Sequence, residues 1–349
     1  MPVASRILVT RHSGKVRHAV TVKEDLMQPV APSGRQAELV HGDARVVVTE
    51  VGAGLREYQV GDRHVLDGYP PDAMASRGRG QLLAPWPNRI ADGRYAFAGS
   101  TYQLALNEVA LRNASHGLVR WSAWRLEQST PDAVRASFVL RAQSGYPFTI
   151  AFTADYRLAG DGLTMTFTAT NVGAGPAPVG LGVHPYFAVA GLGGGAEVAD
   201  EVTLTVPAAT RLLTDDRLIP TGTAPVDAHP VDGGPAGTTV GSFDFRRARP
   251  IGELVLDTCY TDLAHDPDGR ARAVLAVPGG DALTVWMDEA WGYLQVFTAD
   301  TLGPAQRRRS IAVEPLTCPA NAFNSGAGLR TLAPAESFGG SWGISPAFG

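Results

Sequence analysis

A glutamate interrupts an apolar run near the end of the sequence, in residues 311–318, IAVEPLTC. The run has the composition of a buried strand, and burying a carboxylate without a partner is costly. Glu314 is therefore expected either to be held by hydrogen bonds or to be available for proton transfer, with its pKa raised by partial desolvation. Pro315 is expected to end the strand and to leave the carboxylate at the edge of a pocket.

Two histidines also have neighbours that suggest chemistry. His184 ends an apolar segment and precedes Pro185 and Tyr186, so its imidazole is expected to be partly desolvated and to change charge easily near neutral pH. The pattern fits a general acid and a core histidine equally well. His116 precedes Gly117, a residue that lets the backbone approach another group closely. A histidine in this setting is either a hydrogen-bonded structural residue or part of a site.

An amide and a guanidinium follow two prolines in residues 85–90, PWPNRI. The prolines restrict the backbone, so Asn88 and Arg89 would meet a ligand at low entropic cost. A ligand rich in hydroxyl groups would suit both side chains. The alternative is a surface turn in which Arg89 pairs with a nearby carboxylate.

A second carboxylate and a second amide lie in strand-like runs of the C-terminal third. Asp257 lies in an alternating run at 256–263, and Gln295 lies among aromatic residues at 291–298. Proteins bind sugars with aromatic faces and polar edges, because a sugar ring has apolar C–H faces and a rim of hydroxyls. This combination of side chains favours a carbohydrate ligand.

Several other classes of protein are disfavoured. No His or Cys pair has the spacing of metal ligands, and no phosphate loop, dinucleotide fingerprint or nucleophile elbow occurs; neither a metal nor a cofactor is expected. The formal charge is −4, so nucleic acid is not expected as a partner. The two cysteines are expected to be reduced core thiols. With no apolar run of membrane-spanning length and no signal sequence, the protein is expected to stay in the cytoplasm and off the membrane.

The elements that must position these groups are predicted to be strands. Helical periodicity is almost absent, and 40 glycines and 25 prolines in 349 residues argue against long helices. No repeat of 40–50 residues supports a propeller, so we expect an all-β protein, a single large antiparallel β-sandwich at 36–349 with an N-terminal extension at 1–35 outside the fold. Further strands are expected at 46–51, 55–60, 95–97, 102–104, 133–140, 148–157, 163–170, 201–206, 256–263, 273–277, 283–287 and 294–298, in addition to the one that carries Glu314.

In their order along the chain, these motifs closely resemble the aldose 1-epimerase (galactose mutarotase) family, from about residue 36 to 346. The resemblance implies a galactose mutarotase-like supersandwich without metal or cofactor, acting on a monosaccharide, a hexose such as galactose or glucose, as a monomer or homodimer. Two motifs, at His184-Pro185 and Glu314-Pro315, follow a looser bacterial branch rather than the better-known galactose enzymes. The implied roles are general base for Glu314, general acid for His184, and sugar ligands for Asn88, Arg89, His116, Tyr186, Asp257 and Gln295.

The chemistry of the family requires an acid and a base. Interconverting α and β anomers needs a base that removes the proton of the C1 hydroxyl and an acid that protonates the ring oxygen, so that the ring opens. Three alternatives remain. A glycosidase would use Asp257 and Glu314 as its carboxylate pair. A non-catalytic sugar-binding or sensor protein would need no acid and base. An epimerase for a phosphorylated hexose would need added Arg or Lys around the cleft.

Overall fold

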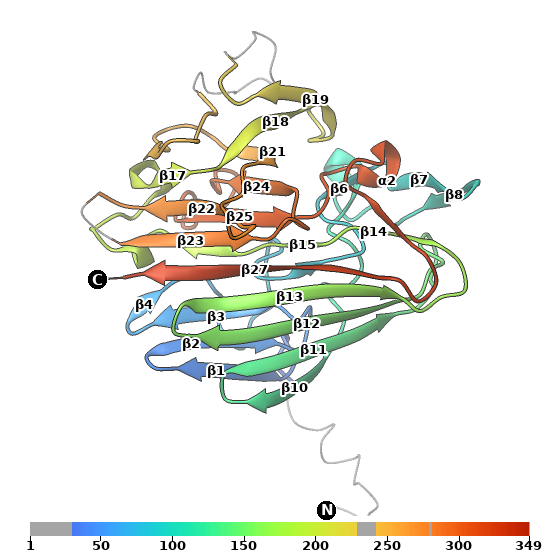
Figure 1. The fold of residues 1–349 in the computed structure, drawn as a ribbon, viewed down its shortest axis with the longest axis horizontal. Coiled ribbons are helices and arrows are strands. Elements are labelled where there is room, and N and C mark those ends of the chain that lie inside the picture. The colour runs from blue at the N-terminus through green and yellow to red at the C-terminus, as the bar shows by residue number, and fades with distance from the viewer. Residues whose placement is uncertain (1–29, 229–241, 279–280, 349) are drawn as a thin grey trace, which may run out of the picture.

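Strands form nearly all of the regular structure, which confirms the predicted all-β class. The computed structural model describes residues 30–228, 242–278 and 281–348 (Figure 1). Most of the proposed extension at 1–35 therefore lies outside the described residues. The first strand, β1 (Gln36–His41), begins where the main domain was expected to begin, and the residue before it, Arg35, accepts a backbone hydrogen bond of 2.7 Å from Glu50.

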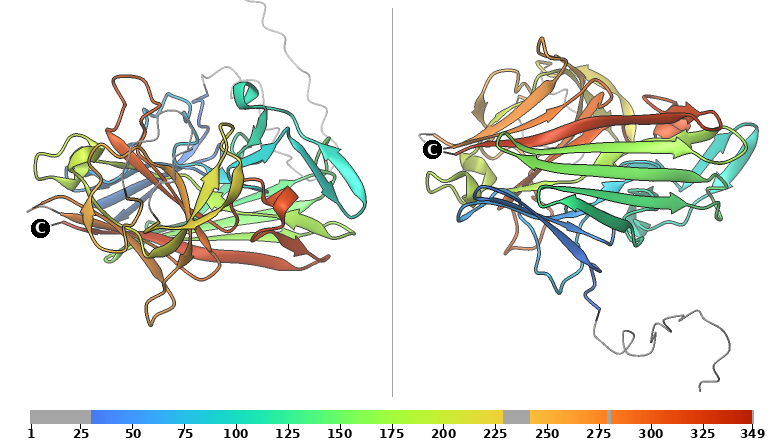
Figure 2. Two further views of the ribbon diagram at one scale, coloured as in Figure 1. Left: turned by 90° about the horizontal axis from the view of Figure 1, so that it is seen from above. Right: turned by 60° about the horizontal axis from the view of Figure 1, so that its bottom comes forward.

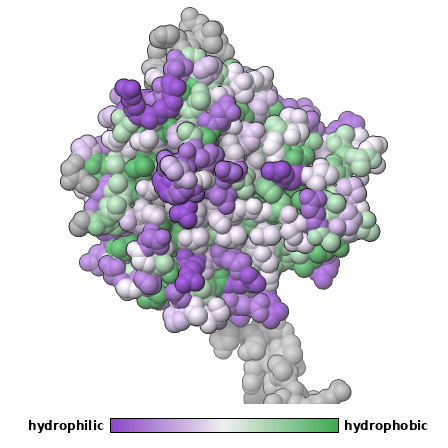
Figure 3. Space-filling view, viewed as in Figure 1, coloured by the Kyte–Doolittle hydropathy of each residue, from purple (hydrophilic) through white to green (hydrophobic). Residues whose placement is uncertain are grey.

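The larger of the two main sheets has nine antiparallel strands. Along β12 the side chains alternate between buried and partly exposed, because one face of the sheet packs on the core and the other faces outward. Polar and apolar side chains are mixed over the face shown in Figure 3. The strands follow one another in this order: β10 (Arg125–Thr130), β11 (Ala133–Leu140), β12 (Ile150–Ala159), β13 (Gly162–Asn171), β27 (Ser337–Ala347), β23 (Ala282–Met287), β22 (Ala271–Ala276), β17 (Thr203–Thr205) and β20 (Arg249–Pro250).

The second sheet carries the candidate site. Its central strand β25 (Ser310–Leu316) is buried at every position, which explains why it looks like a continuous apolar run in the sequence. The order is β19 (Pro220–Pro225), β18 (Ala208–Thr214), β21 (Asp257–Leu263), β24 (Tyr293–Phe297), β25, β15 (Gly182–Val183) and β5 (Leu82–Leu83), and β16 (Tyr186–Ala188) also pairs with β25.

Smaller elements cover the edges of the two sheets. The right-hand view of Figure 2 shows the blue four-stranded sheet lying against the green strands of the nine-stranded sheet. It consists of β1, β2 (Ala44–Thr49), β3 (Leu55–Val60) and β4 (Arg63–His64). The remaining elements are the pairs β6 (Arg89–Ala91) with β9 (Asn113–Ser115), β7 (Arg94–Phe97) with β8 (Ser100–Gln103) and β14 (Ala177–Val179) with β26 (Arg330–Leu332), the helix α2 (Ala322–Ser325), and the short 3₁₀ helices η1 (Val109–Leu111), η2 (Ala190–Leu192) and η3 (Ala199–Glu201).

All the strands predicted from the sequence are present, with ends within two residues of the expected ones. Several strands were not predicted, among them β1, β10, β18 and β19. The longest of these unpredicted strands is β27, whose glycines and serines hide its strand pattern. Those glycines let it lie between β13 and β23 (Figure 1). A Cβ atom on Gly339 or Gly343 would stand 2.5 Å from a backbone oxygen of β13, so larger residues would push the two strands apart.

The core packs against one face of the eight-stranded sheet and leaves the other face for the site. On β24, Leu294 and Val296 belong to the main core, and on β25 so do Ile311 and Val313. Side chains alternate along a strand, so Gln295, which lies between Leu294 and Val296, and Glu314, which follows Val313, point to the opposite face. This alternation turns Gln295 and Glu314 away from the core.

Candidate active site

The strand register places two of the predicted site residues, Gln295 and Glu314, side by side in one row across the sheet. Gln295 on β24 is directly opposite Glu314 on β25, and Cys259 on β21 is directly opposite Gln295. Residues directly opposite each other in antiparallel strands point to the same face. Cys259, Gln295 and Glu314 therefore follow one another on the face turned away from the core.

His184 extends this row on the other side of Glu314. Strand β15 pairs with β25 at Gly182, and β16 resumes the pairing at Tyr186 with the same register. His184 lies between the two strands, level with Glu314. The interruption of the ladder at this point falls where neither Pro185 nor Pro315 has a backbone N–H to donate.

The acid and base candidates are in contact in a buried setting. Nε2 of His184 lies 3.4 Å from Oε1 of Glu314, and the two residues are 6% and 3% exposed. The imidazole stacks on the ring of Tyr186, with centroids 5.0 Å apart and planes 9° from parallel. The ring of His116 stands nearly perpendicular to that of His184 at 5.3 Å. The fold thus brings together four of the predicted residues.

Burial shifts the pKa values of Glu314 and His184 in opposite directions. Desolvation and the nearby charge of Asp257 raise the pKa of Glu314 well above its usual value, while Arg89 opposes the shift. Desolvation, together with the charge of Arg120, lowers the pKa of His184 to about 3. Both shifts favour a protonated carboxyl beside a neutral imidazole. Moving that proton onto the imidazole gives a carboxylate and an imidazolium without any exchange with solvent.

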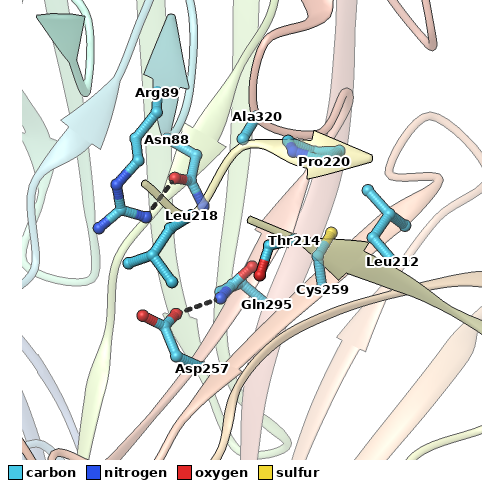
Figure 4. A pocket seen from close by; sticks show the side chains of 10 residues that line it. All are labelled: Asn88, Arg89, Leu212, Thr214, Leu218, Pro220, Asp257, Cys259, Gln295 and Ala320. Atoms are coloured by element: carbon cyan, nitrogen blue, oxygen red, sulfur yellow. Dashed lines mark hydrogen bonds between the residues drawn. The ribbon is translucent and has the colours of Figure 1, made fainter. Parts of the chain in front are cut away.

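Four other predicted residues line a hollow beside this pair (Figure 4). Its empty volume is about 280 Å³, part of which is open to solvent. Nε2 of Gln295 donates a hydrogen bond of 2.5 Å to Asp257, and burial raises the pKa of that carboxyl. The lining residues are Asn88, Arg89, Leu212, Thr214, Leu218, Pro220, Asp257, Cys259, Gln295 and Ala320.

Arg89 pairs with a carboxylate, as one interpretation of the PWPNRI stretch expected, and it also lines the hollow. Its Nε and Nη2 donate to the two carboxylate oxygens of Glu108 at 2.8 and 2.9 Å, and its Nη1 donates to Oδ1 of Asn88 at 2.9 Å. Asn113 donates to the same carboxylate at 3.0 Å. Arg89 therefore lines the hollow with its orientation fixed and its charge balanced by Glu108.

His116 is held close to Asn88 by the backbone. Its N–H donates to the carbonyl of Asn88 at 2.7 Å. The next residue, Gly117, has φ +70°, and a Cβ there would lie 2.0 Å from the carbonyl oxygen of Ala84. The close backbone approach expected at Gly117 is confirmed, because any side chain would displace the 84–90 segment.

One expectation about the strand that carries Glu314 was wrong. Pro315 does not end the strand, since β25 continues to Leu316 and Pro315 stands opposite Leu294. The proline is tolerated because its missing N–H falls at the interruption of the ladder described above. Glu314 is not among the residues that line the hollow; it lies one strand further in, beside Gln295.

Sequence reasoning missed the hairpin that covers the hollow and the charged residues around it. Leu218 comes from the turn between β18 and β19, and Figure 4 shows it between Arg89 and Gln295. The available signal was Leu218 and Ile219, two apolar residues that follow the polar run TDDR. The other residues that were not predicted are Arg79, Gln81, Glu108, Arg120, Leu212, Thr214 and Pro220.

The part of the chain that the structure describes contains neither a cluster of metal ligands nor a membrane-spanning helix. No group of three or more His, Cys, Asp or Glu side chains there is placed to hold a metal ion. No helix in the described ranges is long and apolar enough to cross a membrane.

Comparison with known proteins places the chain in a family. The family model described as aldose 1-epimerase matches residues 35–345. The chain belongs to the aldose 1-epimerase family. The uncharacterized protein YihR of Escherichia coli is 32% identical over 304 residues, which are 86% of this chain and 89% of that protein. A galactose mutarotase from Rattus norvegicus is 32% identical over 182 residues, 50% of this chain and 47% of the relative.

Solved structures of the aldose 1-epimerase family share the fold. The GalM/aldose epimerase homologue from C. elegans has a TM-score of 0.76 at 16% identity and covers 90% of this chain and 99% of its own. A putative aldose 1-epimerase from Escherichia coli has a TM-score of 0.73 at 19% identity, with coverage of 90% and 99%. The predicted galactose mutarotase-like architecture is thereby confirmed.

Proposed function

We propose that this protein is an aldose 1-epimerase that interconverts the α and β anomers of a monosaccharide. The observation that carries the proposal is the contact of 3.4 Å between His184 and Glu314, in a buried row next to a hollow lined by amide, guanidinium and carboxylate groups. Membership of the family supports the same reaction class.

The pair of side chains can complete the reaction without a net change in protons. In the productive state Glu314 is a carboxylate and His184 an imidazolium. Glu314 takes the proton of the C1 hydroxyl while His184 gives its proton to the ring oxygen, and the C1–O5 bond breaks to give an aldehyde. After rotation about C1–C2, the same transfers in reverse close the ring on the other face. Each group ends as it began.

The polar lining of the hollow suits hydroxyl groups of the sugar. Asp257 and Gln295 offer a carboxylate and an amide side by side, and Asn88 and Arg89 offer an amide and a guanidinium from the opposite wall (Figure 4). Glu108 fixes Arg89 before any ligand arrives, which lowers the entropic cost of binding.

Polarimetry tests the proposal directly. Freshly dissolved α-galactose and α-glucose should approach equilibrium rotation faster with the purified protein than without it. The Glu314→Gln variant serves as the inactive control. If the protein accelerates mutarotation of none of the aldoses tried but still binds sugars, it is a sugar-binding protein without epimerase activity.

Replacing Asp257 with Asn should raise KM more than it lowers kcat. An ionised carboxylate accepts hydrogen bonds from sugar hydroxyls in the ground and transition states alike, and such uniform binding is expressed in KM. Losing one charged hydrogen bond costs about 1.5–3 kcal/mol, or roughly ten- to a hundredfold in affinity. Steady-state kinetics on several aldoses measure the effect, and Asp262→Asn, an exposed position on the same strand, is the matched control.

The same variant separates the epimerase from a glycosidase. A glycosidase that used Asp257 and Glu314 as its carboxylate pair would lose kcat first when either became neutral. A collapse of kcat with KM unchanged, or hydrolysis of aryl glycosides by the native protein, would contradict the binding role given to Asp257.

A further inference from the structure

Polar atoms without partners gather on the histidine side of the row. Among the described residues, buried side-chain atoms that lack a hydrogen bond include one atom from each of five neighbouring residues. Buried polar groups are normally paired, because leaving one unpaired costs stability. A group of them in one place therefore indicates a position that a ligand or ordered water fills. The atoms are Nε of Arg79, Oε1 of Gln81, Nδ1 of His116, Nε of Arg120 and Nδ1 of His184.

Hydrogen bonds and ring contacts connect these residues into one cluster, which we call the histidine-side cluster. The backbone N–H of His184 donates to the carbonyl of Gln81 at 3.2 Å. The side chain of Gln81 donates in turn to the carbonyl of Arg120 at 2.7 Å. His116 faces His184 with the ring centroids 5.3 Å apart. Gln81 thus ties the segment that carries Arg120 to the segment that carries the proposed acid.

The cluster contains one positive charge that no carboxylate balances. Arg79 lies 4.7 Å above the ring of Tyr186, but its guanidinium is paired with Asp67 at 2.6 Å. Within the described residues the side chain of Arg120 makes neither an ion pair nor a hydrogen bond. Its guanidinium carbon lies 5.3 Å from the centroid of the Trp121 ring. An arginine that is partly removed from water and has no anion is a ready site for one.

The opposite wall of the site has no such excess of positive charge. There Arg89 is bound through two hydrogen bonds to Glu108, and Asp257 adds a further carboxylate. An anionic group on the substrate would therefore be repelled from the hollow and attracted to Arg120.

The connectivity of the sugar ring indicates which substituent can reach Arg120. The ring oxygen is bonded to C1 and C5. If Glu314 acts at the C1 hydroxyl and His184 at the ring oxygen, C5 and its substituent C6 extend from the ring oxygen away from Glu314. That direction leads past His184 to its neighbours in the histidine-side cluster.

We propose that the preferred substrate is an aldose with a singly charged acid group on C6, such as a hexuronic acid, and that Arg120 binds this group. The proposal rests on the proposed function, because the orientation of the ring follows from the roles of Glu314 and His184. One unbalanced arginine matches one negative charge, and its planar fork of N–H donors fits a carboxylate.

The test compares two sugars that differ only at C6. Mutarotation of α-galacturonate and α-galactose is followed with the native protein and with Arg120→Gln, Arg120→Lys and Arg211→Gln. Arg211 is a matched control, since its Nε is also buried without a partner and its guanidinium lies over Phe243, on the core side of β18. The same comparison with glucuronate and glucose covers the other common ring configuration.

Native kcat/KM should favour the acid sugar by about tenfold or more, and Arg120→Gln should reduce this ratio by roughly ten- to a hundredfold. Arg120→Lys should keep part of the preference, because it retains the charge but not the fork. Arg211→Gln should leave the ratio unchanged. Equal kcat/KM values for the two sugars with the native protein, as expected if the cluster holds only water, would overturn the proposal. An equal loss of kcat/KM for both sugars in Arg120→Gln would overturn it as well. A higher kcat/KM for galactose 6-phosphate than for galacturonate would contradict the proposal that the acid group on C6 carries a single charge.

Calorimetric binding to Glu314→Gln separates this proposal from the proposed function. If galacturonate binds in an Arg120-dependent manner while the native protein epimerises no sugar, the acid site stands and the epimerase function fails. If galactose is epimerised but acid sugars have no advantage in binding or turnover, the epimerase stands and the acid site fails.

Discussion

Glu314→Gln is expected to lower kcat for mutarotation by roughly 10²–10⁴, the usual contribution of a placed general base. The amide has nearly the same size as the carboxyl and fits between Gln295 and His184, so the fold should remain intact. Glu289→Gln, an exposed site, is the matched control for steady-state kinetics. Turnover near the native value in folded Glu314→Gln would show that another group is the base.

The same substitution should have a pH-dependent effect on stability. Because burial raises the folded-state pKa of Glu314, the stability that its protonated form provides is complete below the unfolded pKa and is lost as pH rises through the folded one. Glutamine cannot ionise. The Tm of Glu314→Gln minus that of the native protein should therefore increase from acid to neutral and alkaline pH. A constant difference would mean that the carboxyl titrates normally.

His184→Asn should reduce kcat to a similar extent, roughly 10²–10⁴, with a smaller effect on sugar binding. An acid acts mainly in the transition state, so its loss should lower kcat more than affinity. The stacking of the His184 ring on Tyr186 affects the shape of the site and not the proton transfer. Stopped-flow mutarotation together with calorimetric affinity measures the two effects separately. His41→Asn, exposed on β1, is the control. Loss of affinity with kcat unchanged would make His184 a ligand instead of the acid.

Much of the fold was predictable because strand periodicity is a local property. Leu163 to Thr170 alternates regularly, and the structure has β13 there with both ends extended by one residue. Glu314 was recognisable because a carboxylate in an apolar run is unusual whatever its partners. Strand β27 was not predictable, since its glycines are required by contacts with β13 that only the folded chain contains.

The relations between site residues could not be derived from the sequence alone. His184 and Glu314 are 130 positions apart, and their contact depends on which strands are neighbours and in which register. The pairing of Arg89 with Glu108 and the lack of a partner for Arg120 likewise depend on loops that meet only in three dimensions. Pro315 was misjudged for the same reason, because its effect depends on the direction in which its nitrogen points.

The complete burial of β25 affects how the site can open. Glu314 is carried by the central strand of its sheet, between β24 on one side and β15 and β16 on the other, whereas Arg89 is carried by the two-stranded pair β6 and β9 at the periphery. Amides in central strands exchange with solvent only when most of a domain unfolds, and peripheral ribbons open at lower free energy. We therefore expect the proposed base to belong to the slowest-exchanging part of the chain, and we expect local opening to release the segment that carries Arg89 while the proposed proton-transfer groups keep their geometry.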